Sequence, residues 1–285
     1  MYGTQDLGGS AAAIFGGATG NSAATVFDRV SGDLAQSRPL LSPRDVTAWW
    51  STRAMGSACS MGSTVWRYCG PGVRRYGPPV TRVVTVANLK GGSAKTTSAV
   101  YLAHEWHRAG HRVLVVDADP QGSALRWSEL AGWPLPALGL PVRDLHRRLA
   151  GIVGDGYDLV VVDTPPMDEA GGIVHSALRA ASDVVVPVAP TMVELDRLPP
   201  VWAAVADAGA LADLPPAVSV LLTRTVPRAS STDVVRAAVV ESGRRVLTAT
   251  VPRRESYAQS YGGPVDPSEH YAAAAVEILT SEYVA

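Results

Sequence analysis

Residues 90–97 read Lys-Gly-Gly-Ser-Ala-Lys-Thr-Thr and hold the only two lysines of a 285-residue chain, Lys90 and Lys95. An apolar stretch over residues 83–87 precedes this segment, and a stretch with helical spacing over residues 98–108 follows it. A phosphate-binding loop requires this order of strand, glycine-rich turn and helix, because its backbone N–H groups and the positive helix N-terminus surround the phosphates. A surface turn with chance lysines is the alternative, and the flanking strand and helix argue against it.

Two further apolar strands end in acidic residues. Residues 112–117 run into Asp117-Ala-Asp119-Pro-Gln-Gly, and residues 159–163 end in Asp163, which Thr-Pro-Pro follows. Ligands of parallel sheets bind at the carboxyl ends of the strands, so we expect these acids to lie beside the phosphate-binding loop.

In this order the three motifs resemble those of the ParA/MinD/Soj family of ATPases, from about residue 81 to the C-terminus. The early Lys90 is similar to the deviant Walker A motif of that family, whereas the usual loop reads G-x-x-x-x-G-K-[ST]. The D-x-D-P-Q-G string that begins at Asp117 is typical of the ParA branch, and the strand that ends in Asp163 resembles the Walker B region. The resemblance implies ATP and Mg²⁺ as cofactors and Mg-dependent hydrolysis of ATP to ADP and phosphate.

The resemblance also implies three catalytic residues. Lys95 should neutralise the β- and γ-phosphates, and Asp119 should orient the attacking water. Lys90 should reach across a two-fold interface to the phosphates of a second subunit, so that ATP holds a sandwich dimer together. Other interpretations are that Asp119 caps a helix that starts at Pro120, and that Lys90 contacts only its own nucleotide or solvent.

Further residues are predicted to bind the cofactors. The predicted phosphate cradle comprises Gly91, Gly92, Ser93, Ala94, Lys95, Thr96 and Thr97. Thr223 and Arg224, after a later strand, are predicted to border the adenine. The predicted magnesium site comprises Thr96, Asp117 and Asp163, since Mg²⁺ keeps several waters and takes few protein ligands. Ala94 departs from the usual glycine, which a helical φ would tolerate because only a positive φ demands glycine.

Apolar strands alternate with helical segments from residue 81 onward. Strands are predicted over residues 82–87, 112–117, 157–163, 183–189, 217–223 and 246–251. Helices are predicted over residues 95–109, 120–130, 141–153, 169–181, 194–209, 231–242 and 268–281. This alternation predicts an α/β fold with a doubly wound, mostly parallel sheet and helices on both faces.

An arginine-rich segment suggests a nucleic-acid surface. Between residues 224 and 254 there are seven arginines but only Asp233 and Glu241 as acids, a local net charge of +5 in a chain of net charge −1. Such asymmetry is expected of a surface that binds phosphate backbones, and no base-reading motif accompanies it. The predicted DNA-binding residues, in part from resemblance to the family, are Arg228, Arg253 and Arg254. A solvated arginine surface is the alternative.

Two histidines share a predicted helix. His104 and His107 lie three residues apart, a spacing that could place both on one helix face. A pair of this kind needs further ligands to hold a metal ion, so we expect a solvated helix face instead.

Residues 1–79 differ from the rest of the chain. They are rich in Gly, Ala, Ser and Arg with little periodic hydrophobicity, a composition that favours disorder, with one possible short helix from Ser42. Both cysteines, Cys59 and Cys69, lie here, so residues 80–285 lack cysteine ligands for an iron–sulfur cluster. We expect a leader over residues 1–79 and an ATPase domain over residues 80–285. Alternatively translation starts at Val80, since bacteria can begin on a valine codon.

These observations predict a ParA-type partition ATPase that is cytoplasmic and nucleoid-associated. Its ATP-state homodimer would bind nonspecific DNA, and a ParB-like adaptor would stimulate hydrolysis to segregate plasmid, chromosome or phage-like DNA. A MinD-like ATPase and an ATPase that positions a protein cargo are the alternatives. A MinD-like protein needs a basic amphipathic C-terminal helix, and no Lys or Arg follows Arg254, so no membrane partner is expected.

Overall fold

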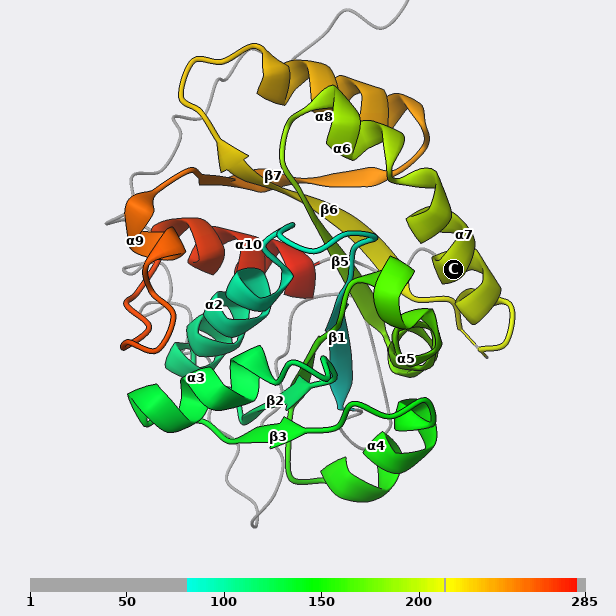
Figure 1. Cartoon of the computed structure of the whole chain (residues 1–285), viewed down its shortest axis with the longest axis vertical. Coiled ribbons are helices and arrows are strands. Elements are labelled where there is room, and N and C mark those ends of the chain that lie inside the picture. The colour runs from blue at the N-terminus through cyan, green and yellow to red at the C-terminus, as the bar shows by residue number, and fades with distance from the viewer. Residues whose placement is uncertain (1–80, 213, 281–285) are drawn as a thin grey trace, which may run out of the picture. The chain divides into compact units, whose positions relative to one another are not determined.

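A computed structural model describes residues 81–212 and 214–280. Seven parallel strands form one sheet in the order β3-β2-β4-β1-β5-β6-β7 (Figure 1). Their bounds are β1 Arg82–Val86, β2 Val113–Asp117, β3 Ala137–Gly139, β4 Leu159–Asp163, β5 Asp183–Val188, β6 Ala217–Thr225 and β7 Arg245–Pro252. The predicted fold class is confirmed. The predictions for residues 1–79, their short helix and the boundary at residue 80 lie outside the described residues.

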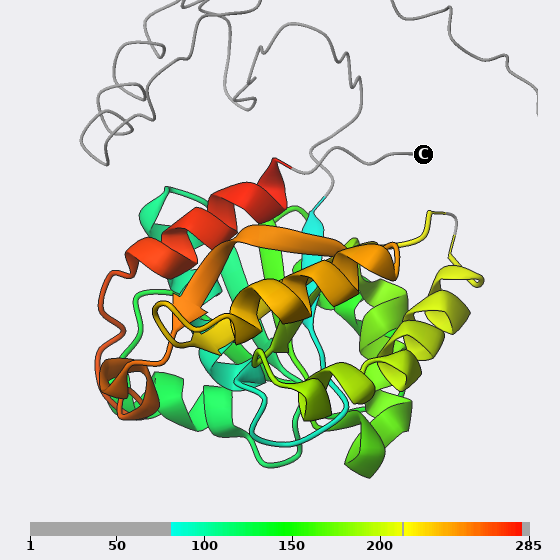
Figure 2. The same ribbon diagram turned by 90° about the horizontal axis from the view of Figure 1, so that it is seen from above.

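Helices cover both faces of the sheet. They are α2 Lys95–Arg108, α3 Ser123–Ala131, α4 Leu145–Val153, α5 Met167–Ala180, α6 Met192–Asp196, α7 Pro199–Gly209, α8 Ser231–Glu241, α9 Glu255–Ala258 and α10 Glu269–Leu279. Side chains alternate along each strand, so Val113 and Val115 of β2 join the core below α2, α3 and α10, whereas Leu114 and Val116 join the core below α4 and α5. Figure 2 shows α10 and α8 on opposite sides of β7.

The predicted elements are found, with differences in their bounds; the helix predicted over residues 141–153 begins at Leu145, and the strand predicted over residues 157–163 begins at Leu159. α3 begins at Ser123 because a turn occupies residues 119–122, and the predicted helix over residues 194–209 is two helices, α6 and α7. Two prolines open α7, and proline has no N–H with which to continue the preceding helix. The short elements β3 and α9 were not predicted, since neither is long enough to show a period. No helix in residues 81–212 or 214–280 is long and apolar enough to cross a bilayer.

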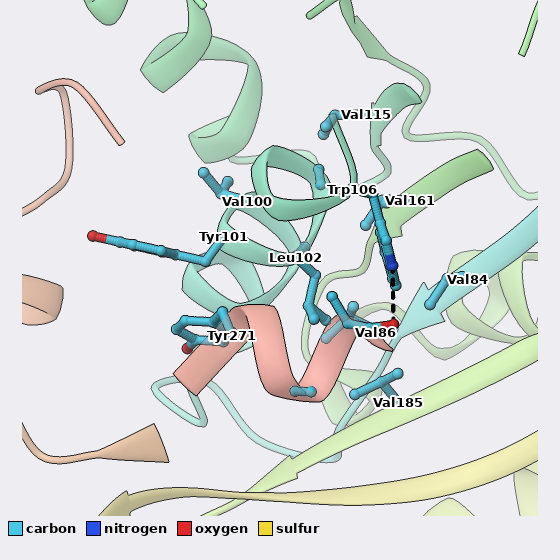
Figure 3. Close-up of a cluster of buried hydrophobic side chains, with 14 of the residues drawn as sticks. Val84, Val86, Val100, Tyr101, Leu102, Trp106, Val115, Val161, Val185 and Tyr271 are labelled. Carbon is cyan, nitrogen blue, oxygen red and sulfur yellow. Dashed lines mark hydrogen bonds between the residues drawn. The ribbon is translucent and has the colours of Figure 1, made fainter. Parts of the chain in front are cut away.

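Helix α2 is almost entirely buried. Figure 3 shows its side chains packed between the valines of β1, β2, β4 and β5 and Tyr271 of α10. Trp106 donates its Nε1 hydrogen to the Ala275 carbonyl at 3.1 Å, which joins α2 to α10. This packing fixes the helix whose N-terminus carries the predicted phosphate-binding loop.

His104 belongs to this core, so the prediction of a solvated face is wrong for it. The residue is 3% exposed, and its Nδ1 donates to the Val100 carbonyl at 2.8 Å. Burial lowers the pKa of His104 to about 4, so the ring is neutral at physiological pH. No cluster of three or more His, Cys, Asp or Glu that could hold a metal ion occurs within the described part of the chain.

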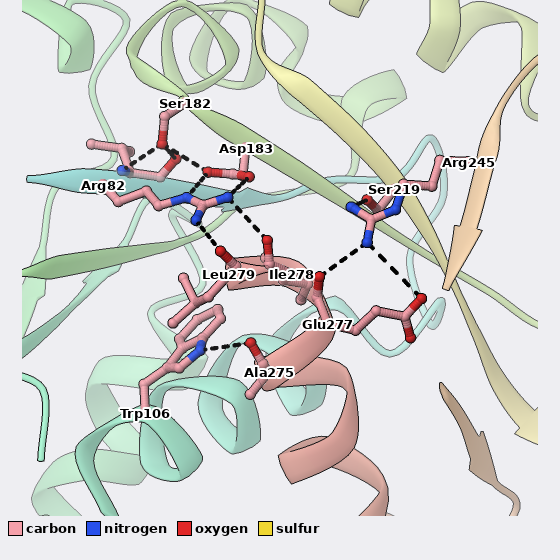
Figure 4. A network of polar contacts seen from close by, with 11 residues as sticks. Arg82, Trp106, Ser182, Asp183, Ser219, Arg245, Ala275, Glu277, Ile278 and Leu279 are labelled. Carbon is pink, nitrogen blue, oxygen red and sulfur yellow. Dashed lines mark hydrogen bonds and ion pairs between the residues drawn. The ribbon is translucent and has the colours of Figure 1, made fainter. Parts of the chain in front are cut away.

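Hydrogen bonds join the last helix, α10, to the first strand, β1. Arg82 forms an ion pair with Asp183 of β5 at 2.6 Å and donates to the carbonyls of Ile278 and Leu279 at the end of α10 (Figure 4). Arg245 of β7 donates to the Glu277 carbonyl at 3.0 Å in the same network. A guanidinium at a helix C-terminus satisfies carbonyls that have no partner within the helix. These contacts close the fold around α2.

Candidate nucleotide-binding site

The predicted phosphate-binding loop joins β1 to α2 at the carboxyl edge of the sheet. The Lys95 Nζ donates to the Lys90 carbonyl at 2.9 Å, and the Ser93 hydroxyl donates to the same carbonyl at 3.1 Å. Gly92 has φ +71°, a conformation that favours glycine. Lys95 is 7% exposed, and burial lowers its pKa, whereas Asp163, Asp119 and Asp168 act in the opposite direction. The loop therefore forms a compact ring with one ammonium inside it.

Two buried polar residues that we did not single out from the sequence anchor this loop. Asn88 donates its Nδ2 hydrogen to the Pro187 carbonyl of β5 at 2.7 Å and accepts the Leu89 N–H at 2.6 Å. The Thr164 hydroxyl donates to the Val86 carbonyl at 2.8 Å. Their only signal in the sequence is that each directly follows an apolar strand.

Asp163 lies at the centre of the site, where β4 is in register with Val86 of β1 and Asp117 of β2. It is fully buried, and neither carboxylate oxygen accepts a well-formed hydrogen bond from the described residues. Burial and the nearby Asp117 raise the pKa of Asp163 to about 8; the Thr96 hydroxyl, close but without a well-formed hydrogen bond, lowers it only in part. A buried carboxylate of this kind is stabilised as an anion by a cation. Asp163 and Thr96 therefore fit a hard cation such as Mg²⁺.

Asp117 and Asp119 shape the turn between β2 and α3. The Asp117 carboxylate is buried and accepts the Asp119 N–H at 3.0 Å and the Leu125 N–H at 2.9 Å. Asp119 is half-buried, and its Oδ1 accepts the Gln121 N–H at 2.9 Å. Asp119 therefore caps a turn rather than a helix that starts at Pro120. Asp117 organises the backbone with both oxygens, which sequence reasoning did not anticipate.

Lys90 forms an ion pair that the sequence did not predict. Its Nζ lies 2.5 Å from the Asp168 carboxylate, in the first turn of α5. The Lys90 side chain is 46% exposed, in contrast to the buried Lys95. The one signal in the sequence was an acidic residue five positions after Asp163, at the start of a helix.

Ala94 adopts a left-handed backbone conformation, which favours glycine over alanine. Its φ of +65° is left-handed, whereas we had considered a helical φ as the condition for tolerating alanine. The left-handed region costs a residue with a Cβ about 1 kcal/mol. The loop ring, closed by Lys95 and Ser93 onto the Lys90 carbonyl, imposes this backbone.

Substitution of Ala94 by glycine should therefore stabilise the protein by up to about 1 kcal/mol, reduced by the greater freedom of glycine in the unfolded chain. Urea unfolding followed by circular dichroism measures the change. Gly92→Ala is the matched opposite, because nothing lies within 4 Å of the added Cβ and φ is also positive. Gly92→Ala should lower the free energy of unfolding by about the same amount. If Ala94→Gly is less stable than the wild type, the left-handed backbone at position 94 does not strain the protein.

The two residues predicted to border the adenine lie at the end of β6. Thr223 is buried, and its hydroxyl has no partner within the described residues, whereas Arg224 is exposed with φ +55°. A cavity of about 420 Å³ opens directly after them. Its lining is Thr225, Val226, Pro227, Arg228, Ala229, Ser230, Thr232, Asp233 and Thr250. Thr223 and Arg224 are neighbours of this cavity and do not line it.

The seven arginines between residues 224 and 254 divide into two groups. Three stabilise the fold: Arg236 donates to the Leu247 carbonyl, Arg245 belongs to the α10 network, and Arg244 lies 5.2 Å above the Trp202 ring. Four are exposed near the carboxyl ends of β6 and β7, namely Arg224, Arg228, Arg253 and Arg254. The predicted DNA-binding residues are all in the second group, and Arg254 also approaches Glu269 at 3.5 Å.

Known proteins share this sequence and architecture. The profile of the CobQ/CobB/MinD/ParA nucleotide binding domain matches residues 84–265. The chain is 37% identical to the maintenance of carboxysome distribution protein A of Gloeobacter kilaueensis, over 63% of this chain and 77% of that protein. It is 38% identical to the chromosome-partitioning ATPase Soj of Thermus thermophilus, over 38% of this chain and 54% of that protein.

A solved structure agrees with the fold. The cobyrinic acid a,c-diamide synthase of Mycobacterium smegmatis, solved with bound ADP and magnesium, superposes with a TM-score of 0.56 at 26% identity, over 70% of this chain and 94% of that protein. The family profile begins within β1 and covers the other six strands and both acidic strand ends of the site. The chain therefore belongs to the CobQ/CobB/MinD/ParA family of nucleotide-binding proteins, as a ParA-type member of this ATPase family.

Proposed function

We propose that the chain is a DNA-partition ATPase that hydrolyses ATP with Mg²⁺ and uses the cycle to move cargo over DNA. The observation that carries the proposal is the carboxyl edge of the sheet. There, a lysine-bearing loop lies beside a fully buried carboxylate that accepts no well-formed hydrogen bond from the described residues. The solved relative from M. smegmatis holds ADP and magnesium, which supports the same pair of cofactors here.

The residues of the site divide the chemistry among them. The loop amides and Lys95 bind the β- and γ-phosphates, and Thr96 and Asp163 hold Mg²⁺ together with water. Mg²⁺ held there would supply positive charge to neutralise the phosphate oxygens. Asp119 orients the attacking water with the oxygen that the turn leaves available, while Asp117 keeps the turn in shape. Phosphoryl transfer needs this positioning and charge stabilisation more than covalent chemistry.

The ATP state is a homodimer that binds DNA of any sequence. Lys90 lies at the exposed rim of the loop, where it can extend to the phosphates of a second subunit. Arg228 follows β6, and Arg253 and Arg254 follow β7; all three are exposed near the carboxyl edge of the sheet. A dimer would therefore present two copies of this arginine set. A ParB-like adaptor stimulates hydrolysis and releases the dimer. The site of action is the nucleoid, and residues 80–285 form the ATPase domain.

A second candidate is the positioning of a protein cargo. The chain is similar to two proteins named for maintenance of carboxysome distribution, from Gloeobacter kilaueensis and Halothiobacillus neapolitanus, and covers 77% and 81% of them. Both candidates need the same ATP cycle and differ in what the partner protein carries.

Removal of two exposed arginines tests the DNA surface. Arg253→Ala with Arg254→Ala should dimerise with ATP like the wild type but bind DNA at least about tenfold more weakly. Each lost phosphate contact also flattens the plot of log affinity against log salt by roughly 0.9. Fluorescence anisotropy with a random duplex at several salt concentrations measures both effects.

The matched control is Arg147→Ala with Arg148→Ala, an adjacent exposed pair on α4 with the same change of charge. This control should keep the affinity and salt dependence of the wild type. Equal losses in the two double variants would point to a general charge effect, and tight binding by the Arg253/Arg254 variant would move the DNA surface elsewhere.

A further inference from the structure

The ion pair between Lys90 and Asp168 lies within one subunit. Oδ2 of Asp168 is 2.5 Å from Nζ of Lys90, and among the described residues no other carboxylate pairs with this ammonium. The hydrogen bond from Lys90 lowers the pKa of Asp168, so the carboxylate is charged at neutral pH. Both side chains are partly exposed, at 46% and 29%, so the pair can open without unpacking the core.

Backbone contacts fix Asp168 beside the loop. The Met167 N–H donates to the Asn88 carbonyl at 3.3 Å, and the Asp168 N–H donates to the Leu89 carbonyl at 3.2 Å. The start of α5 is thereby joined to the two residues that precede Lys90. The carboxylate therefore has a fixed position, and the long lysine side chain is the part that can move.

We propose that Asp168 is a positioning residue that holds Lys90 in its own subunit and so sets the protein concentration at which ATP-bound subunits pair. This inference rests on the proposed function, in which Lys90 contacts the phosphates of the second subunit. An ammonium bonded to Asp168 at 2.5 Å cannot extend away from its own subunit at the same time. Pairing therefore requires the ion pair to open in each subunit.

The expected size of the effect follows from the strength of partly exposed ion pairs. Such pairs favour the closed arrangement by a factor of about 3. One such pair opens in each subunit of the dimer, so the dimer dissociation constant is raised by this factor squared. Removal of Asp168 should therefore lower the dissociation constant by about tenfold. ATP binding to a single subunit should change by less than about threefold, because Lys95 and the loop amides make those contacts.

Asp168→Asn tests the proposal in the full-length protein. Analytical ultracentrifugation with a non-hydrolysable ATP analogue and Mg²⁺ should give a dimer dissociation constant about tenfold below that of the wild type. Glu169→Gln is the control, since it removes the same charge one residue away and has no ion pair with Lys90 within the described residues. It should leave the dissociation constant unchanged.

A double-mutant cycle separates this role from a general structural one. Lys90→Met should itself weaken the dimer, and in that background Asp168→Asn should leave the remaining dissociation constant, measured at high protein concentration, unchanged, because Asp168 acts through Lys90. The chain has only two lysines, so acylation followed by mass spectrometry reports on Lys90 directly. Its labelling rate should rise in Asp168→Asn and stay unchanged in Glu169→Gln.

The outcomes distinguish this inference from the proposed function. If the wild type dimerises with ATP and Asp168→Asn dimerises equally or more weakly, the holding role is overturned and the dimer stands. If Asp168→Asn also tightens pairing in the Lys90→Met background, the effect does not pass through Lys90 and the inference is wrong. If neither the wild type nor Asp168→Asn dimerises with ATP, both the dimer and the holding role fail.

Discussion

Lys95→Met should weaken ATP binding by roughly a hundredfold, about 3 kcal/mol. The substitution keeps most of the length of the side chain but removes the ammonium from the interior of the phosphate loop, where Lys95 is 7% exposed. In the proposed site this charge faces the phosphates and has no nearby replacement, since Lys90 lies at the rim and pairs with Asp168. Isothermal titration calorimetry with ATP and Mg²⁺ measures the loss.

Lys90→Met is the matched control in the same loop. It should keep the ATP affinity of a single subunit within about threefold, because half of the Lys90 side chain is exposed and exposed charges contribute little. Thermal melts of both variants check that the loop change leaves the fold intact. Wild-type affinity in Lys95→Met would contradict the phosphate role of Lys95.

Asp119→Asn should lower ATP turnover by roughly a hundredfold or more while ATP affinity changes by only a few-fold. Asparagine keeps an oxygen that can accept the Gln121 N–H, so the turn between β2 and α3 survives. It replaces the charged oxygen that we propose orients the attacking water. Phosphate release under saturating ATP and a separate binding titration distinguish the two effects.

Gln121→Ala is the control for the turn itself. Gln121 is exposed, and its backbone N–H, which the substitution keeps, makes the contact with Asp119. Turnover should be that of the wild type. Unchanged hydrolysis in Asp119→Asn would remove Asp119 from the catalytic residues, and a loss of ATP binding would show that its charge serves the nucleotide instead.

The candidate site was largely predictable because its parts are local. A phosphate loop is a continuous segment between a strand and a helix, so the spacing of Lys90, the glycines and Lys95 identifies it. Asp117 and Asp163 are separated by 46 positions in the sequence, but both end parallel strands, and the structure places them in register. The alternation of strands and helices predicted this common edge before any contact was known.

The backbone conformation of Ala94 and the burial of His104 depend on contacts that no local sequence pattern predicts. Alanine at position 94 is ordinary in sequence, and only the closed loop shows that its φ is +65°. Likewise, His104 and His107 have the same spacing in a solvated and in a buried helix. In the structure, His104 is buried and its ring packs edge-on against Trp133, with ring centroids 4.8 Å apart.

By itself the sequence determined the fold class and predicted the phosphate-binding loop and the acids of the candidate site, because hydrophobic period and strand-end position are properties of short segments. Only the tertiary structure decided which charges are free. It bonded Arg236 and Arg245 to backbone carbonyls, left Arg253 exposed, and paired Lys90 with an acid 78 residues away. The physical reason is that the environment of a charge is set by the groups that folding brings within a few ångströms, from anywhere in the chain.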